Sequence, residues 1–316
     1  MEWRKLEVGN MSNTRDFIFL GLTNDWAAQI VLFLLFSVVY LITMVGNIGL
    51  IVLTITDSRL HSPMYFFLCN LSFVDACYSS VVVPKMLAQL ITGNKVITYV
   101  GCVIQFYFFL VFVITEQYVL MIMAYDRFVA ICFPLVYTTK MSKRTCILLA
   151  TFTYVFGVSD AGVQTFFTFT LTYCGSHDIN HFFCSDPPLL KLSCTNTSKK
   201  EFAVFWSSGF NLTTTGLLIS ISYICIIVAI TKIRSTEAKK KTFNTCASHF
   251  TTVSIFYGTL LIYYLQPVST HTIEQDKVLS IFYAVFVPML NPLIYSLRNK
   301  EVKDAVKKVF LRACAQ

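Results

Sequence analysis

Long apolar runs, separated by short polar segments, dominate the chain from residue 27 onward. A helix that rises ~1.5 Å per residue needs about 20 apolar residues to cross the ~30 Å hydrocarbon core of a bilayer. The runs are continuous and do not alternate in polarity, so they predict membrane-spanning helices and not the strands of a barrel. There are seven runs, approximately at residues 27–56, 63–90, 99–132, 144–170, 202–232, 243–266 and 277–297.

Composition agrees with this pattern. Hydrophobic residues make up 55% of the 316 residues, charged residues only 13%, and the mean hydropathy is +0.64. We therefore predict an all-α membrane protein in which residues 27–298 form one seven-helix transmembrane bundle, after an N-terminal tail at residues 1–26. In residues 299–316, apolar positions recur at i, i+3, i+4, i+7 and i+8 with lysines opposite, which predicts a short amphipathic helix on the membrane surface.

Basic residues gather on one side of the predicted bundle. That side holds 16 of the 25 Lys and Arg residues, among them residues 239–241 and six in the C-terminal segment, against five acids. Basic loops stay in the cytosol, so we expect the N-terminus outside and the C-terminus in the cytosol. The net charge of +8 is then explained by membrane lipid as a partner and does not indicate nucleic acid. The first run starts late and at full length, so we expect a signal anchor and not a cleaved signal peptide.

Four of the eleven cysteines fall on the side expected to be extracellular. An even set in an oxidising compartment predicts two disulfides, and spacing alone leaves three pairings open. The four are Cys102, Cys174, Cys184 and Cys194.

Glycosylation sequons occur at four asparagines, but Asn70 and Asn211 lie within predicted spans. Only Asn10 and Asn196 lie where a glycan could be added. Asn10, in the N-terminal tail, is the stronger candidate, and Asn196 is the second.

Two carboxylates interrupt the apolar runs at similar depth, Asp75 in the second and Glu116 in the third. Ionisable groups inside a membrane must find partners or water, so they mark functional sites. The pair could bind a cation, share a proton or act as an acid and base, or it could form a structural polar cluster with Asn47 and Asn291. We find no matched nucleophile, base and oxyanion donors, no phosphate loop and no zinc-ligand cluster, so we predict no enzyme, no cofactor and no metal centre.

Six stretches occur along the chain in a characteristic order. They are "FIFLGLT", "GN" at Gly46–Asn47, "PMYFFLCNLSFVDACYSS", "MAYDRFVAIC", "KKKTFNTCASH" and "PMLNPLIYSLRNKEV". With these stretches the chain resembles the olfactory receptors of the rhodopsin-like (class A) G-protein-coupled receptors, and the tetrapod-type class II is the better match. The resemblance covers almost the whole chain.

This resemblance implies roles for particular residues. Asp126 and Arg127 would form a cytoplasmic clasp that opens towards a G protein; Arg127 follows Glu116 by three helical turns and so shares its inward face. The family's pattern also implies disulfides Cys102–Cys184 and Cys174–Cys194, and an inner polar site at Asp75, Glu116 and Asn47 where sodium is a candidate ligand. It further implies activation switches on the fifth and seventh helices at Tyr223, Asn291, Pro292 and Tyr295. Departures from the family's pattern include Phe128 after the arginine and Tyr154 in the fourth helix.

Helical spacing combined with this resemblance predicts the ligand site. A site between helices should be apolar with a few polar anchors. No cation lies at its centre, which argues against an acidic ligand, and Phe109 stands where an amine-binding aspartate would be needed. We therefore expect a small neutral or weakly polar volatile. The predicted lining is Phe109, Leu110, Val113 and Ile114 on the third helix, Ser207, Ser208 and Asn211 on the fifth, and Tyr257, Leu260, Leu261 and Tyr264 on the sixth.

The main functional hypothesis is an odorant receptor, located in sensory cilia, that activates a stimulatory olfactory-type heterotrimeric G protein and raises cyclic AMP. Three alternatives remain at this stage. One is a transporter or ion channel that uses the buried carboxylates, although the chain shows no internal repeat. The second is an intramembrane enzyme that uses the same two groups. The third is a non-olfactory chemosensory receptor of the same fold.

Overall fold

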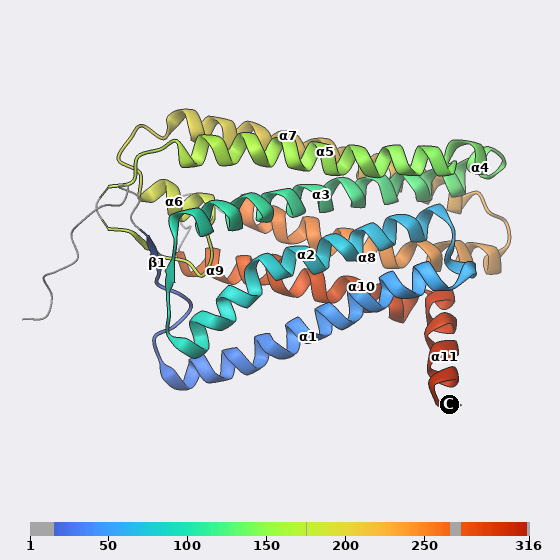
Figure 1. Ribbon diagram of the computed structural model, residues 1–316. Coiled ribbons are helices and arrows are strands. Elements are labelled where there is room, and N and C mark those ends of the chain that lie inside the picture. The colour runs from blue at the N-terminus through green and yellow to red at the C-terminus, as the bar shows by residue number, and fades with distance from the viewer. Residues whose placement is uncertain (1–15, 175, 266–272, 315–316) are drawn as a thin grey trace, which may run out of the picture.

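The computed structural model describes residues 16–174, 176–265 and 273–314, and within these residues long helices form a bundle (Figure 1). Seven helical segments lie side by side and run back and forth along the long axis of the bundle. They are α1 (Trp26–Thr56), α2 (Pro63–Thr92), α3 (Tyr99–Cys132), α5 (Lys143–Phe169), α7 (Ser198–Thr231), α8 (Thr236–Leu265) and a composite seventh segment made of α9 (Ile273–Ile281), the π-helix η3 (Phe282–Phe286) and α10 (Val287–Arg298).

Six of these segments are long and apolar enough to cross a membrane, and the seventh, α8, has a shorter apolar part at Cys246–Ile262. The predicted all-α seven-helix fold is thus correct. Helix α8 begins seven residues before the predicted run, because its first turns are polar but still favour helix. Helix α7 likewise begins at Ser198 and not at residue 202.

Helix α3 lies at the centre and packs against α2, α5 and α7. Its closest approach to α5 is at Gly157, where an added Cβ would lie 3.0 Å from the carbonyl oxygen of Val111 and would also clash with the hydroxyl of Thr115. A second close approach joins α1 to α10, since a Cβ on Gly46 would lie 3.0 Å from the ring of Pro292. At Gly157 a methyl group would force the facing atoms to move, and at Gly46 it would fit only if the ring of Pro292 shifted by a few tenths of an ångström.

A small three-stranded sheet covers one end of the bundle, which we call the sheet end. Strand β1 (Phe17–Phe19) is central, antiparallel to β2 (Val96–Ile97) and parallel to β3 (Asp178–Ile179). Phe17 and Phe19 point into the core while Ile18 is exposed, as the alternation of a strand requires. The sequence had suggested only a tail at residues 1–26, yet this part of it is the strand that joins the two loops.

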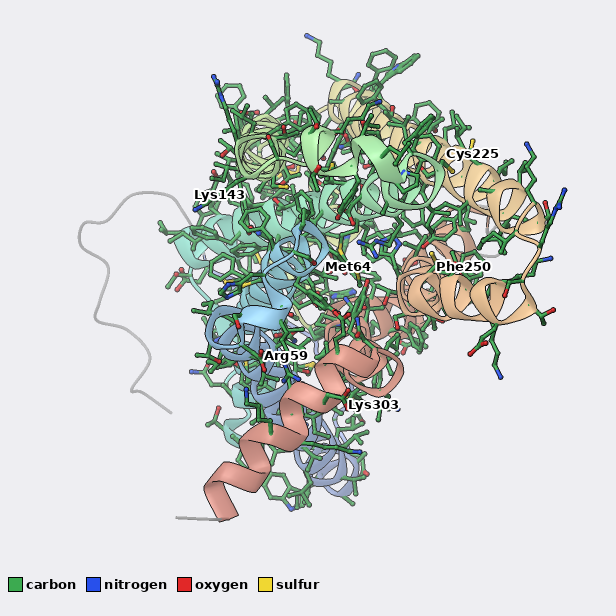
Figure 2. All side chains as sticks on the ribbon, turned by 90° about the vertical axis from the view of Figure 1, so that its right-hand side faces the viewer. Arg59, Met64, Lys143, Cys225, Phe250 and Lys303 are labelled. Atoms are coloured by element: carbon green, nitrogen blue, oxygen red, sulfur yellow. A yellow bond between two sulfur atoms is a disulfide. The ribbon has the colours of Figure 1, made fainter. Side chains whose placement is uncertain are left out.

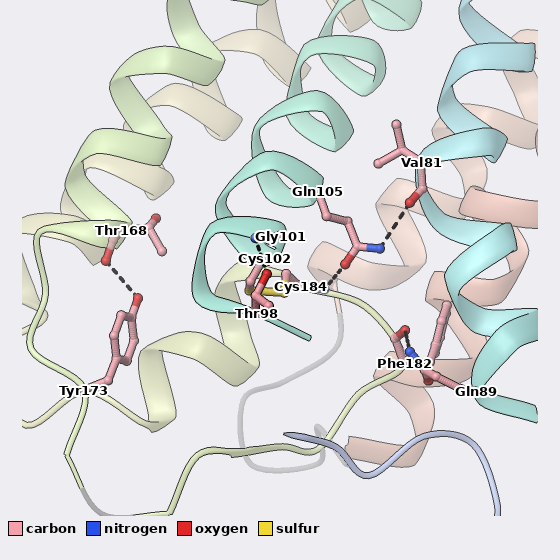
Figure 3. Close-up of a disulfide and its surroundings, with 10 residues drawn as sticks. All are labelled: Val81, Gln89, Thr98, Gly101, Cys102, Gln105, Thr168, Tyr173, Phe182 and Cys184. Atoms are coloured by element: carbon pink, nitrogen blue, oxygen red, sulfur yellow. Dashed lines mark hydrogen bonds between the residues drawn. A yellow bond between two sulfur atoms is a disulfide. The ribbon is translucent and has the colours of Figure 1, made fainter. Parts of the chain in front are cut away.

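Two disulfides and a set of side-chain amides fix the long loop at the sheet end. Cys102 is bonded to Cys184, and Cys174 to Cys194, which are the pairs implied by the family resemblance. Figure 3 shows how Gln105 of α3 bridges α2 and the loop: its Nε2 donates to the carbonyl of Val81 at 3.1 Å, and its Oε1 accepts from the amide of Cys184 at 3.0 Å. The loop continues into a short helix, α6 (Asp186–Lys191).

The opposite end, which we call the α11 end, carries helix α11 (Lys300–Cys314). Figure 2 looks onto this end and shows α11, with Lys303, lying across the ends of other helices. The hydroxyl of Tyr65 on α2 donates to the carboxylate of Glu301 at 2.6 Å and holds the start of α11 against the bundle. Short turns also occur here, at η1 (Ser58–Leu60), η2 (Pro134–Val136) and α4 (Tyr137–Lys140).

Candidate functional site

A buried ion pair occupies the α11 end of helix α3. Arg127 donates from Nε to Asp126 Oδ2 at 3.0 Å, and its Nη2 also contacts the same oxygen. Tyr137 of α4 donates its hydroxyl to the other oxygen, Asp126 Oδ1, at 2.8 Å. Burial and the neighbouring Asp126 carboxylate raise the pKa of Tyr137, so the phenol stays protonated and remains a donor. Asp126 is thus held from two sides, by its neighbour on the helix and by the adjoining loop.

A histidine that the sequence did not single out ties three helices together beside this ion pair. His249 of α8 lies with Nδ1 2.6 Å from the hydroxyl of Tyr223 on α7 and with Nε2 3.1 Å from the carbonyl oxygen of Leu120 on α3. A carbonyl only accepts, so Nε2 of the neutral ring carries the proton and Nδ1 accepts from Tyr223. The signal was present in "TCASH", where the histidine follows the expected start of the sixth helix.

The two intramembrane carboxylates meet at one amide. Asn291 of α10 donates from Nδ2 to Asp75 Oδ1 and Oδ2, at 3.2 and 3.0 Å, and lies 3.5 Å from Glu116 Oε1. Both carboxylates are fully buried. The fold therefore brings together α2, α3 and α10 around Asp75, Glu116 and Asn291.

Asn47, predicted to share this inner site, makes different hydrogen bonds. Its Nδ2 donates to the carbonyl oxygens of Thr43 and Pro288, both at 3.0 Å. The Pro288 carbonyl is available because the residue four positions further on is Pro292, which has no N–H to donate. Asn47 thus joins α1 to α10 one turn before Pro292.

Aromatic side chains fill the sheet-end half of the bundle around Phe109 of α3. Its ring lies 4.9 Å from that of Phe183, 5.5 Å from that of Tyr78 and 6.2 Å from that of Tyr283, measured between centroids. These contacts come from the long loop, α2 and the seventh helix. Leu110 and Val113 pack against the same cluster, and Ile114 is buried.

The polar residues predicted on the fifth helix meet an aspartate that the sequence reasoning missed. Asp160 of α5 accepts from the hydroxyl of Ser207 at 2.8 Å and from Nδ2 of Asn211 at 2.9 Å. Asn211 Oδ1 in turn accepts from the hydroxyl of Tyr118 at 2.9 Å. Ser208 is half-buried on the same helix. The spacing of Asp160 and Gln164, four residues apart on one apolar helix, was the signal available in the sequence.

The residues predicted to line the ligand site from the sixth helix, α8, do not share one environment. Tyr257 donates its hydroxyl to Thr215 Oγ1 at 2.6 Å, and Leu260 packs against the central core. Leu261, in contrast, is 48% exposed and faces away from the bundle, so it does not belong with the predicted lining. The reason is geometric, because consecutive residues of a helix are rotated by about 100° and Leu260 occupies the inward position. The side chain of Tyr264 lies outside the described residues.

Comparison with known proteins decides the family. The sequence profile of the family described as "Olfactory receptor" matches residues 36–313. The chain belongs to the olfactory receptor family. It is similar to mouse olfactory receptor 5AR1 and to human olfactory receptor 5AR1, each 53% identical over 304 residues that cover 96% of this chain and 98% of the relative. Mouse olfactory receptor 5M5 is 49% identical over 98% of this chain and 97% of its own length.

Among solved structures, squid rhodopsin superposes with a TM-score of 0.72 at 18% identity, covering 92% of this chain and 88% of rhodopsin. This similarity shows the shared seven-helix fold. As an olfactory receptor with a rhodopsin-like fold, the chain is a receptor and not an enzyme, and it is a multi-pass protein of the plasma membrane.

Proposed function

We propose that this olfactory receptor binds a small, neutral or weakly polar volatile molecule between the sheet-end halves of its helices. We further propose that binding activates a stimulatory, olfactory-type heterotrimeric G protein and raises cyclic AMP. The observation that supports the ligand class is the make-up of the sheet-end half, where the aromatic cluster around Phe109 adjoins a few polar side chains such as Asn211. Apolar walls with a few fixed polar groups are typical of sites for small molecules.

We also propose that the sheet end is extracellular, that the α11 end faces the cytosol, and that the receptor works in sensory cilia. The excess of basic residues at the α11 end supports this orientation. Under this proposal Asn196, which is exposed at the sheet end, can carry a glycan. Asn10, the other proposed glycan site, lies outside the described residues.

The proposed switch is the ion pair of Asp126 and Arg127. A buried ion pair is costly to break but offers two discrete states, one closed and one in which Arg127 contacts a partner. His249 and Tyr223 connect the fifth and sixth helices to Leu120, which lies on α3 seven residues before Arg127. Pro292 loosens the seventh helix beside Asn291 and Tyr295, so that ligand-induced movement at the sheet end can reach the other end.

We propose that the inner carboxylates share one sodium ion or one proton. Asp75 and Glu116 are both fully buried and share one amide donor, that of Asn291. Two negative charges this close together are unfavourable in a low-dielectric site unless a cation or a proton neutralises one of them. Among the described residues, Glu116 Oε2 has no hydrogen-bond partner, so an oxygen is available to a hard cation or to a proton.

The test is a panel of chemically diverse volatiles applied to cells that express the receptor, with cyclic AMP as the readout. At least one volatile should raise cyclic AMP, and Arg127→Ala should abolish the response with surface expression retained. Arg59→Ala is the matched control, since Arg59 lies at the same end and pairs with Asp57, but half of its own side chain is exposed. An unaltered response in Arg127→Ala would contradict the switch, whereas ion flux without a G protein would support the transporter hypothesis instead.

A further inference from the structure

Polar side chains form a continuous seam between α5 and α7, inside the sheet-end half of the bundle. On α5 they recur every four residues, and on α7 they recur at intervals of seven and four, so each set occupies one face of its helix. Hydrogen bonds cross between the two faces: Gln164 Nε2 donates to Ser207 Oγ at 3.0 Å, and Lys200 Nζ donates to the carbonyl of Gln164 at 3.1 Å. This polar seam consists of Asp160, Gln164, Thr168, Lys200, Ser207 and Asn211.

Counted together with Asp186 of α6, the polar seam has two acids, Asp160 and Asp186, but only one cation, Lys200. Lys200 is only 1% exposed and pairs with Asp186 of α6, with Nζ 3.2 Å from Oδ1. The same Asp186 oxygen also accepts from the hydroxyl of Thr168 at 3.0 Å. Across the described parts of the chain, no ion pair within 4 Å joins Asp160 to a cation, although the charge of Lys200 acts on it from a longer distance. The hydrogen-bond donors of Asp160 are the neutral side chains of the seam.

The hydrogen bonds of Asp160 leave acceptor capacity unused. A carboxylate only accepts and offers about four lone-pair positions. Ser207 has a single hydroxyl proton to give, although its oxygen lies 2.8 Å from both carboxylate oxygens, and Gln164 approaches only to 3.4 Å. Asp160 is half-buried and not fully enclosed by the bundle. In a membrane interior, a carboxylate surrounded by neutral donors favours a charged or strongly polarised donor as its next partner.

The seam is connected to the residues that line the proposed ligand site. Asn211 accepts from Tyr118 of α3, and its backbone carbonyl accepts from the hydroxyl of Thr215 at 2.6 Å. Thr215 then accepts from Tyr257 of α8. A molecule bound against Asp160 would therefore act on a hydrogen-bond chain that reaches the third and sixth helices.

We propose that Asp160 is a specificity-determining residue that receives the hydrogen-bond-donating head group of the ligand, a hydroxyl or a protonated amine. This inference rests on the proposed odorant-receptor function. It narrows the neutral ligands to hydrogen-bond donors and extends the ligand class to protonated amines. It selects alcohols and amines over ketones, esters and ethers, which only accept. Asp160, on the fourth transmembrane helix (α5), would also provide the acidic group that the third helix lacks at the position of Phe109.

The experiment uses volatiles that share a carbon skeleton and differ in their head group: cyclohexanol, cyclohexylamine and cyclohexanone, together with 1-hexanol, hexylamine and hexanal. Cyclic AMP is measured in cells that express the intact receptor, with surface expression measured in parallel. In the wild type, an alcohol or an amine should be about 10-fold to 100-fold more potent than its carbonyl analogue, the factor expected for one hydrogen bond to a charged group.

Asp160→Asn keeps the size of the side chain, removes its charge and replaces one of the two acceptor oxygens with an NH2 donor. It should therefore remove this preference and bring the potencies of the donor and carbonyl probes together. Asp160→Glu should retain the preference. Glu274→Gln is the matched control, because Glu274 is an acid at the same end whose side chain is 76% exposed, and it should leave the ranking of the probes unchanged.

Each outcome separates the hypotheses. If Asp160→Asn lowers the potency of all probes equally, Asp160 only braces α5 against α7 and the proposal is overturned. If the wild type responds to the carbonyl probes as well as to the donors, the ligand assignment fails while the odorant-receptor function stands. A wild-type receptor at the cell surface that responds to no probe here and to no volatile of the diverse panel contradicts both. The wild-type ranking needs no variant, so a poorly folded Asp160→Asn does not prevent the test.

Discussion

The hydroxyl of Tyr223 lies 2.6 Å from Nδ1 of His249, whose opposite ring nitrogen lies 3.1 Å from the carbonyl oxygen of Leu120. One imidazole therefore links the fifth, sixth and third transmembrane helices immediately beside the ion pair of Asp126 and Arg127. Any outward movement of α8 must break at least one of these two hydrogen bonds.

We predict that His249→Phe raises ligand-independent signalling. The ring volume is retained but both hydrogen bonds are lost, and each contributes about 0.5–1.5 kcal/mol to the resting arrangement. The loss of both bonds totals about 1–3 kcal/mol, so the fraction of receptor that is active without ligand should rise by about 5-fold to 150-fold, measured as basal cyclic AMP per receptor at the surface. Tyr223→Phe removes only one of the two bonds and should give a smaller rise. Basal signalling equal to that of the wild type in both variants would show that the link does not restrain the receptor.

We predict that Gly157→Ala destabilises the receptor by about 1–3 kcal/mol, because the added methyl group overpacks the contact between α5 and α3 at Val111 and Thr115. The measurement is the midpoint of thermal unfolding of the purified receptor. Gly162→Ala is the control on the same helix, since a Cβ there has no atom within 4 Å. Equal midpoints for the two variants would contradict the close approach.

We predict that mild acid destabilises the receptor through His181. Burial, and to a smaller extent the charge of Lys277, lowers the pKa of His181 from 6.5 to about 3. Below pH 6.5 the unfolded chain binds a proton that the folded loop excludes, so stability falls as the pH falls from 6.5 towards 3. Between pH 6.5 and 5 the loss is about 2 kcal/mol.

The measurement for His181 is the unfolding midpoint at pH 7 and at pH 5. His181→Gln should reduce the difference between the two midpoints, whereas His177→Gln, on the same loop but only half-buried, should retain it. If the unfolding midpoint of His181→Gln fell between pH 7 and pH 5 by as much as that of the wild type, the burial argument would be contradicted.

The long helices were predictable from the sequence because a membrane span needs a continuous apolar run, and six of the seven observed segments satisfy that requirement directly. Strand β1 was not predictable from local pattern. Its three residues, Phe17–Phe19, form a strand only because the loops carrying β2 and β3 lie on either side. Tertiary pairing, and not intrinsic propensity, determines such a short strand.

The functional residues divide in the same way. Asp75, Glu116 and Arg127 stand out because charge inside an apolar run is rare. Asp160 lies in "FGVSDAGVQ", a stretch that already contains small and polar residues, so the sequence pattern does not set its charge apart. Its importance depends on Ser207 and Asn211, which are more than forty residues away in sequence and meet it only in the folded bundle. His249 was missed for the same reason, because its two partners belong to other helices.

The central claim is that a molecule bound at the sheet end separates the helices at the α11 end. The most direct measurement is the distance between bioorthogonal labels placed at Lys143 on α5 and Lys240 on α8, which are both exposed, with and without an activating volatile. We predict that the volatile lengthens this distance, while a reference pair at Arg59 and Lys143 keeps its separation, and that Asp160→Asn abolishes the change for an amine. An unchanged distance between Lys143 and Lys240, in a receptor that still raises cyclic AMP, would contradict the claim.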